Sequence, residues 1–289
     1  MKQNPFGLYD FLGYLIPGAL FMYILYFFFN MDFAYNLLDF EKENRSSINN
    51  EILTFIPAVI LAYIIGHTFS LLSSFFIENY ATYLYGYPSK YLFIENHKFW
   101  SKESGCKKTW KNLGRIILFI ILLPISFTIF ALKLLNITLF EQAKPLPKEL
   151  GETVFNQCMT ILNTNLKIST KEIAEDKEEK GISRDYFRII YHFIFENSEK
   201  HSVKLQNYVA LYGFCRTISF IFLINFWISS YLFIFDNENY IYLILLFLIL
   251  SFSFFTGFIK FYRRYTLEAL MGATIFNKYS ITGTVAPNN

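Results

Sequence analysis

The chain has 289 residues and a formal net charge of +3, with 54% apolar, 20% aromatic and only 17% charged residues. An average soluble domain carries about 25% charged residues, so this composition argues against a soluble globular protein. The small net charge gives no support for nucleic-acid binding. Three cysteines (Cys106, Cys158 and Cys215) stand far apart without CxxC spacing, which argues against a disulfide framework and a zinc site.

Five apolar segments have the length of membrane spans, since a hydrocarbon layer of about 30 Å needs roughly 20 apolar helical residues. In chain order they are Leu8–Phe29, Ile52–Ile77, Ile116–Phe140, Tyr208–Phe235 and Tyr240–Ile259. The first is too long for the core of a signal peptide, and no A-x-A-like cleavage site follows it, so we expect a retained span. The predicted fold is all-α, a polytopic transmembrane helical bundle with a small helical cytosolic region.

Loop charges favour four crossings, because Lys and Arg stay on the cytoplasmic side. The loop Asn30–Glu51 holds two basic and five acidic residues, whereas Glu78–Arg115 holds seven basic and three acidic ones. With four spans, the acidic loop and the turn Asp236–Asn239 are external and both termini are cytoplasmic. Segment 116–140 is then re-entrant or buried, and Pro124 predicts a break within it. The alternative is an ordinary fifth span.

This topology divides the chain into three regions. Residues 1–140 form an N-terminal membrane region with spans 8–29 and 52–77, the basic cytosolic loop 78–115 and the apolar segment 116–140. Residues 141–207 form a cytosolic helical region. Residues 208–289 form a membrane hairpin with spans 208–235 and 240–259 and a short cytosolic tail.

Within the cytosolic region, Ile182–Glu196 carries apolar residues at a period close to that of a helix. Such an amphipathic helix packs on its neighbours or lies at the membrane surface. The run Lys171–Lys180 mixes charges of both signs, which is typical of a solvated helix or loop.

His67 falls near the middle of the second span, where polar groups are costly and usually face protein or water. Gly66, Ser70 and Ser74 stand beside it at four-residue intervals, a stripe that lets another helix approach closely. Two interpretations remain open for His67: a proton-sensitive or gating residue at a helix interface, or a histidine hydrogen-bonded within a packed bundle.

Asp10 and Arg216 fall near the cytoplasmic ends of their predicted spans, and we expect them to form an ion pair that neutralises two costly charges. Arg216 can alternatively extend to lipid headgroups. Pro17 and Gly18 together predict a bend in the first span.

The sequence contains no HExxH, GxSxG or P-loop motif and no Gly-rich nucleotide fingerprint. We therefore predict a non-enzymatic protein and assign no catalytic, cofactor-binding or metal-binding residue.

Three patches carry a resemblance: Tyr9-Asp10-Phe11-Leu12-Gly13-Tyr14-Leu15-Ile16-Pro17-Gly18, Ala62-Tyr63-Ile64-Ile65-Gly66-His67 and Leu211-Tyr212-Gly213-Phe214-Cys215-Arg216. In this order the chain resembles a set of uncharacterised bacterial multi-span membrane proteins, some of phage-defence type. The resemblance implies a membrane effector of antiviral defence and assigns no functional residue.

Three functions follow from these features. The first is an oligomeric effector or gated pore of the bacterial inner membrane that responds to a cytosolic signal or partner. The second is a transporter or channel subunit for a small solute, and the third is a membrane anchor or scaffold for a soluble enzyme. The expected partners are the lipid bilayer, further copies of the chain and a soluble cytosolic protein, with no nucleic acid.

Overall fold

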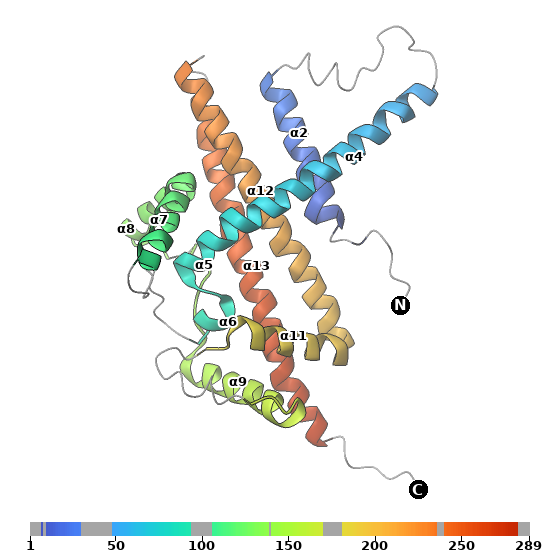
Figure 1. The fold of residues 1–289 in the computed structure, drawn as a ribbon, viewed down its shortest axis with the longest axis vertical. Helices are drawn as coiled ribbons and strands as arrows, with labels where there is room; N and C mark the ends of the chain where they lie inside the picture. The colour runs from blue at the N-terminus through green and yellow to red at the C-terminus, as the bar shows by residue number, and fades with distance from the viewer. Residues whose placement is uncertain are drawn as a thin grey trace. The chain divides into compact units, whose positions relative to one another are not determined.

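The computed structural model describes residues 7, 10–29, 48–93, 106–138, 140–169, 181–235 and 240–282, and every regular element in them is helical (Figure 1). The helices separate into two compact units. Unit 1 comprises residues 1–78, 122–129 and 213–258, and unit 2 comprises residues 79–121, 130–212 and 259–289. Among the described residues, four helices are long and apolar enough to cross a membrane, or five if the bent pair α7–α8 forms one span. The predicted all-α class is thus confirmed, whereas the number of crossings stays a prediction. The candidate spans are Phe11–Phe28, Phe55–Tyr91, Glu199–Phe235 and Ile241–Ile275.

The N-terminal part of unit 1 is built from two helices that pack closely. The π-helical turn η1 (Phe11–Leu15) leads into α2 (Ile16–Phe29), and Pro17 is the second residue of α2. Because proline has no N–H to donate, one hydrogen bond of the regular ladder is missing there. The predicted bend at Pro17 and Gly18 stays a prediction. The long helix α4 (Ile48–Ser73) packs against η1 and α2 and ends in a second π-helical turn, η2 (Ser74–Glu78).

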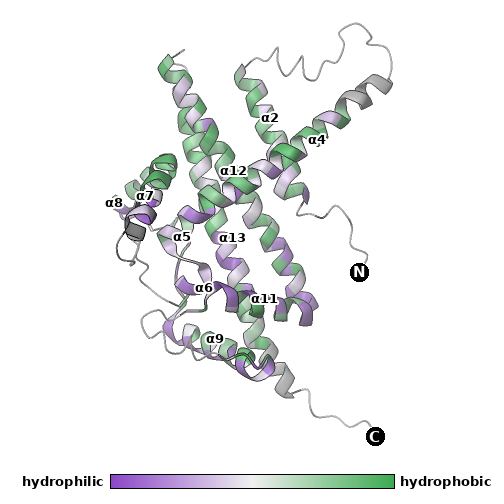
Figure 2. Ribbon diagram, in the orientation of Figure 1, coloured by the Kyte–Doolittle hydropathy of each residue, from purple (hydrophilic) through white to green (hydrophobic). Residues whose placement is uncertain are grey.

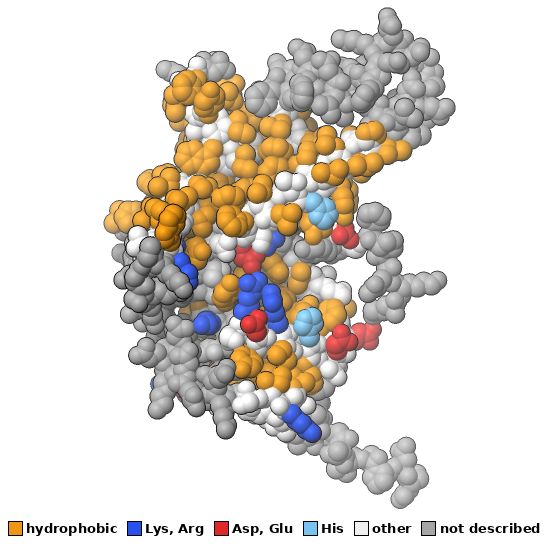
Figure 3. Space-filling model, in the orientation of Figure 1, with side chains coloured by type: hydrophobic (Ala, Val, Ile, Leu, Met, Phe, Trp, Pro, Cys, Tyr) orange, Lys and Arg blue, Asp and Glu red, His pale blue; other side chains and the backbone are white. Residues whose placement is uncertain are grey.

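Unit 1 also contains parts of two very long helices, α12 (Glu199–Phe235) and α13 (Ile241–Thr282). They are joined by reciprocal hydrogen bonds: Ser219 Oγ donates to the Ser251 carbonyl at 2.9 Å, and Ser251 Oγ donates to the Ser219 carbonyl at 3.1 Å. Along α12 the colour changes from hydrophilic at the Glu199 end to hydrophobic at the Phe235 end (Figure 2). The visible surface over α4 is mainly hydrophobic (Figure 3).

Unit 2 has a core of the kind found in soluble domains. Its elements are α5 (Asn79–Tyr85), α6 (Pro88–Tyr91), α7 (Cys106–Ile121), α9 (Lys148–Thr160), the π-helical turn η3 (Ile161–Asn165), α11 (Arg184–Asn197) and the polar parts of α12 and α13. Five of these elements supply fully buried side chains to the core: Val154, Cys158, Ile161, Leu162, Ile190, Ile194, Leu205, Ala269, Leu270 and Ala273. Leu92 and Ile182, which lie just outside the helices, are fully buried in the same core. Helix α11 confirms the predicted helix, and its apolar face packs on these neighbours.

The boundaries of unit 2 do not coincide with those of the three predicted regions, whose membrane and cytosolic assignments stay predictions. Helix α12 begins at Glu199, nine residues before the predicted span, and α13 continues to Thr282 where a short tail was expected. Both helices continue because their polar parts keep apolar residues at helical spacing, and Leu205, Ala269 and Ala273 fill the core. The segments predicted as a separate region, 141–207, therefore share one core with residues on both sides of them.

Segment 116–140 contains the break that Pro124 predicted. Helix α7 ends at Ile121, α8 (Leu123–Leu134) begins after one residue, and the two helices are bent by 87°. Asn136, with φ of 55°, ends α8 in the left-handed conformation that asparagine tolerates. The predictions made for residues 30–47, 170–180 and 236–239 lie outside the described residues and stay predictions.

Candidate functional site

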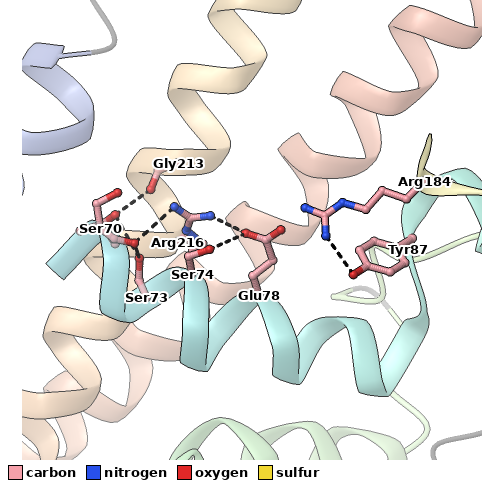
Figure 4. A network of polar contacts seen from close by, with 9 residues as sticks. Ser70, Ser73, Ser74, Glu78, Tyr87, Arg184, Gly213 and Arg216 are labelled. Atoms are coloured by element: carbon pink, nitrogen blue, oxygen red, sulfur yellow. Dashed lines mark hydrogen bonds and ion pairs between the residues drawn. The ribbon is translucent and has the colours of Figure 1, made fainter. Parts of the chain in front are cut away.

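The most unusual site in unit 1 is an ion pair between two candidate membrane spans (Figure 4). Arg216 of α12 donates from Nη1 to Glu78 Oε2 at 2.5 Å, and the side chains are only 10% and 17% exposed. A second nitrogen, Nη2, donates to the Ser70 carbonyl at 3.4 Å. The guanidinium therefore joins α12 to α4 and to the π-helical turn that follows α4.

Hydroxyl groups surround the pair and extend the contact between the helices. Ser74 Oγ donates to Glu78 Oε2 at 3.2 Å, and the two residues are four positions apart in the chain. Ser73 and Thr217 are fully buried, and their hydroxyl oxygens lie 3.4 Å apart across the helix interface. Ser73 also donates to the Ser70 carbonyl, and Thr217 donates to the Gly213 carbonyl. The carboxylate thus accepts two hydrogen bonds, which offsets part of the cost of burying it.

One atom of the site remains unsatisfied. In the part of the chain that the structure describes, Arg216 Nε is buried and has no hydrogen-bond partner. An unsatisfied nitrogen in a charged group costs free energy, which reduces the net contribution of the pair to stability.

The predicted partner of Arg216 was wrong. Asp10 accepts a hydrogen bond from the Gly7 amide at 3.0 Å at the start of the first helix, while Glu78 occupies the place beside Arg216. Sequence reasoning counted Glu78 as a loop residue because it follows the apolar run. The signal was nevertheless present, since Glu78 continues the four-residue spacing of Gly66, Ser70 and Ser74.

The residues of that stripe take part in two helix contacts. A Cβ atom on Gly66 would overlap the backbone of Tyr14 in η1, and one on Gly18 would overlap the carbonyl of Ala62 in α4. The two glycines therefore allow the helices to meet backbone to backbone. Ser70 and Ser74 lie further along, where they contact the ion pair.

His67 lies beside the same glycine contact. Its ring stacks on Tyr14 with centroids 3.6 Å apart and meets the edge of Tyr63 at 4.7 Å. The ring thus sits in an aromatic cluster between η1 and α4, a few turns from the Arg216 pair along α4. The structure does not bring His67 and Arg216 into one site.

A second charged cluster, which sequence reasoning missed, joins α12 and α13 in unit 2. Glu268 Oε1 lies 2.9 Å from His201 Nδ1 and 3.2 Å from Lys204 Nζ, and its side chain is 19% exposed. The signal was weak: His201 and Lys204 share one helical face, and Glu268 is a single acid in a basic stretch. Its small neighbour Gly272 leaves room for His201 and Ile194.

Comparisons with known proteins add no identification: the chain matches no known protein family, no curated protein sequence and no solved structure. Among the described residues, no group of three or more His, Cys, Asp or Glu side chains is placed to hold a metal ion.

Proposed function

We propose that this protein is a non-enzymatic effector of the bacterial inner membrane, in which a cytosolic helical unit controls a membrane bundle closed by the Glu78–Arg216 pair. One observation carries the proposal. Helices α12 and α13 are each continuous helices that contribute residues to both units. A change in the packing of unit 2 therefore acts directly on the helix that bears Arg216.

Helix lengths support a membrane location for unit 1. An ionisable residue stands at one end of each of the four apolar stretches. Asp10 directly precedes Phe11–Phe28, and Glu78 follows Phe55 by 23 residues. Arg216 precedes Phe235 by 19 residues, and Lys260 follows Ile241 by 19 residues. At 1.5 Å per residue these stretches measure about 27–35 Å, close to the thickness of the hydrocarbon layer. Alternating chain direction then puts all four charges on the same side.

Unit 2 supports an even number of crossings between residues 93 and 146. The Leu146 amide donates to the Leu92 carbonyl at 2.9 Å, and the Ile182 amide donates to the Ser89 carbonyl at 3.0 Å. Residues before and after segment 116–140 thus share one core and must lie on one side of the membrane. This favours four spans with a re-entrant or interfacial α7–α8 segment over five spans.

The buried Glu78–Arg216 pair suits a contact that opens when the membrane bundle is gated. A buried ion pair is weak evidence for stability, because desolvation offsets much of the attraction, but the loss of one partner leaves a costly charge. Unit 2 is large enough to receive a cytosolic signal or partner, and self-association through unit 1 would provide the walls of a pore. The resemblance of three sequence patches adds a setting in phage defence to this proposal.

Conductance of proteoliposomes tests the proposal without knowledge of the trigger. Wild-type protein should leave a potassium-diffusion potential intact. Glu78→Gln should dissipate this potential, because the substitution removes the charge that pairs with Arg216 and keeps the size of the side chain. Glu149→Gln, which removes an exposed carboxylate on α9, is the matched control and should stay tight. The absence of leakage from folded Glu78→Gln protein would contradict a gated opening and favour a scaffold.

A further inference from the structure

Helix α4 carries an exposed apolar stripe with one polar residue in its middle. Ile60, Ile64 and Leu71 are 54%, 56% and 74% exposed, and the partly exposed His67 stands between the last two. The intervals of four, three and four residues give a seven-residue repeat and put all four side chains on one side of the helix. We call these four residues the His67 stripe.

The opposite side of α4 packs within unit 1, which fixes the direction of the stripe. Ala62, Phe69 and Ser73 are buried, and at 3.6 residues per turn they lie about half a turn away from the stripe. On the same buried side, a Cβ at Gly66 would overlap the backbone of Tyr14 in η1. Because these contacts hold the buried side against the bundle, the His67 stripe faces outward.

His67 lies midway along its candidate span. It follows Phe55 by 12 residues and precedes Glu78 by 11, which corresponds to about 18 Å and about 17 Å at 1.5 Å per residue. With unit 1 in the membrane location proposed above, the imidazole therefore lies near the centre of the hydrocarbon layer.

At that depth the imidazole has ring contacts alone. Within the described parts of the chain it stacks on Tyr14 and meets the edge of Tyr63, but it has no hydrogen-bond partner. Acyl chains neither donate nor accept hydrogen bonds, and a polar group at this depth is costly unless protein or water satisfies it. Lipid thus suits the apolar residues of the stripe but not its centre.

A second copy of the chain supplies the missing partner. Two copies with the same topology are related by a two-fold axis along the membrane normal, so their α4 helices run parallel and residues at equal depth meet. His67 then faces His67 of the second copy. A neutral imidazole has one donor and one acceptor nitrogen, so two of them form an N–H···N hydrogen bond. The seven-residue repeat on either side lets the apolar side chains interdigitate as in a coiled coil.

We propose that the His67 stripe is the self-association surface of the protein, on which α4 of a second copy packs in parallel and the two His67 imidazoles share a hydrogen bond. The proposal rests on the membrane location of unit 1 and identifies the contact through which the proposed effector self-associates. It does not depend on the Glu78–Arg216 pair.

Disulfide crosslinking in native membranes tests the surface. In a Cys106→Ser background, in which the other two native cysteines are buried, Ile64→Cys and Leu71→Cys should each link two copies, because residues at equal depth in the contact come within disulfide reach. Ile249→Cys, 58% exposed on α13, is the matched control and should stay monomeric. The absence of linked dimers at both stripe positions would overturn the proposal, as would equal yields at all three positions or a crosslink to a different protein.

Association in liposomes tests the hydrogen bond. Photobleaching counts at a series of protein densities give the dissociation constant of the dimer, which His67→Leu should raise about three- to twentyfold. His67→Asn, whose amide also donates and accepts, should restore association, and Thr68→Val, which removes a neighbouring hydroxyl, is the control. An unchanged constant in His67→Leu, or equal losses in His67→Leu and His67→Asn, would overturn the shared hydrogen bond. The crosslinking variants keep His67, so they decide the question if His67→Leu does not fold.

Neither measurement uses conductance, so failure of this surface and failure of the gated opening can be distinguished. Crosslinked α4 helices together with a tight Glu78→Gln protein would support the surface and contradict the gated opening. Leakage through Glu78→Gln without crosslinks at the stripe would overturn the surface alone.

Discussion

The Arg216 guanidinium donates a 2.5 Å hydrogen bond to the Glu78 carboxylate across the interface of α12 with the π-helical end of α4. Each side chain is more than four-fifths buried. Because a charge that loses its partner stays desolvated, the pair couples the two helices more strongly than its net contribution to stability suggests. The relationship is specific in geometry, since Ser74 Oγ donates to the same carboxylate oxygen.

Removal of one partner should destabilise the protein more than removal of both. Arg216→Ala leaves Glu78 buried without its cation, and we expect a loss of about 3–5 kcal/mol. Glu78→Leu combined with Arg216→Met leaves no buried charge and should recover most of that loss. Thermal unfolding of the purified protein in detergent measures the difference.

Arg264, exposed on α13, provides the control for this series. Arg264→Ala should change stability by no more than about 0.5 kcal/mol, as is usual for surface substitutions. A loss in Arg216→Ala no larger than in this control would show that the pair does not couple the helices.

Glycine at the contact of α2 and α4 should be far less replaceable than glycine elsewhere. A Cβ at Gly18 or Gly66 would overlap backbone of the facing helix, whereas nothing lies within 4 Å of a Cβ at Gly114 in α7. Gly18→Ala and Gly66→Ala should therefore lower the unfolding temperature markedly or prevent folding. Gly114→Ala should be neutral or stabilising by up to about 1 kcal/mol, because alanine has the higher helix propensity. Equal behaviour of the three variants in a detergent unfolding assay would refute the close contact.

The sequence was sufficient for the helical class, the four candidate spans and the break near Pro124, because long apolar runs and prolines leave strong local signals. The core of unit 2 could not be predicted. Leu205 and Ala273 lie outside the predicted spans, and nothing local in the sequence shows that these parts of α12 and α13 share one core. Which acid pairs with Arg216 depends on the packing of α4 on α12, a tertiary contact that local patterns do not specify.

Cys158 should remain unreactive until the protein unfolds. Burial raises the pKa of its thiol from 9.0 to about 12, so the folded protein holds the neutral form across the usual pH range. Maleimide should label a Cys106→Ser, Cys215→Ser variant only after denaturation, with Cys158→Ala added as the blank. Because the pKa in the folded state is raised, the corresponding stability is complete below pH 9 and is lost as the pH rises from about 9 toward 12. Rapid labelling of the folded variant at pH 8 would contradict the burial of this side chain.

Reporter fusions should place the two sides of segment 116–140 in the same compartment. Helix α8 is too short to cross the bilayer, and hydrogen bonds from Leu146 to Leu92 and from Ile182 to Ser89 hold the flanking chains in one core. Paired fusions to alkaline phosphatase and to green fluorescent protein after Asn44, Ser104, Glu175 and Asn277 should show only the first outside the cytoplasm. A fusion after Asn237, in the turn between the last two spans, serves as a second external reference. Export at Glu175 together with cytoplasmic Ser104 would require a fifth span. It would separate α6 from α9 and α11 across the membrane, which is incompatible with the core of unit 2, so this experiment tests the topology and the fold together.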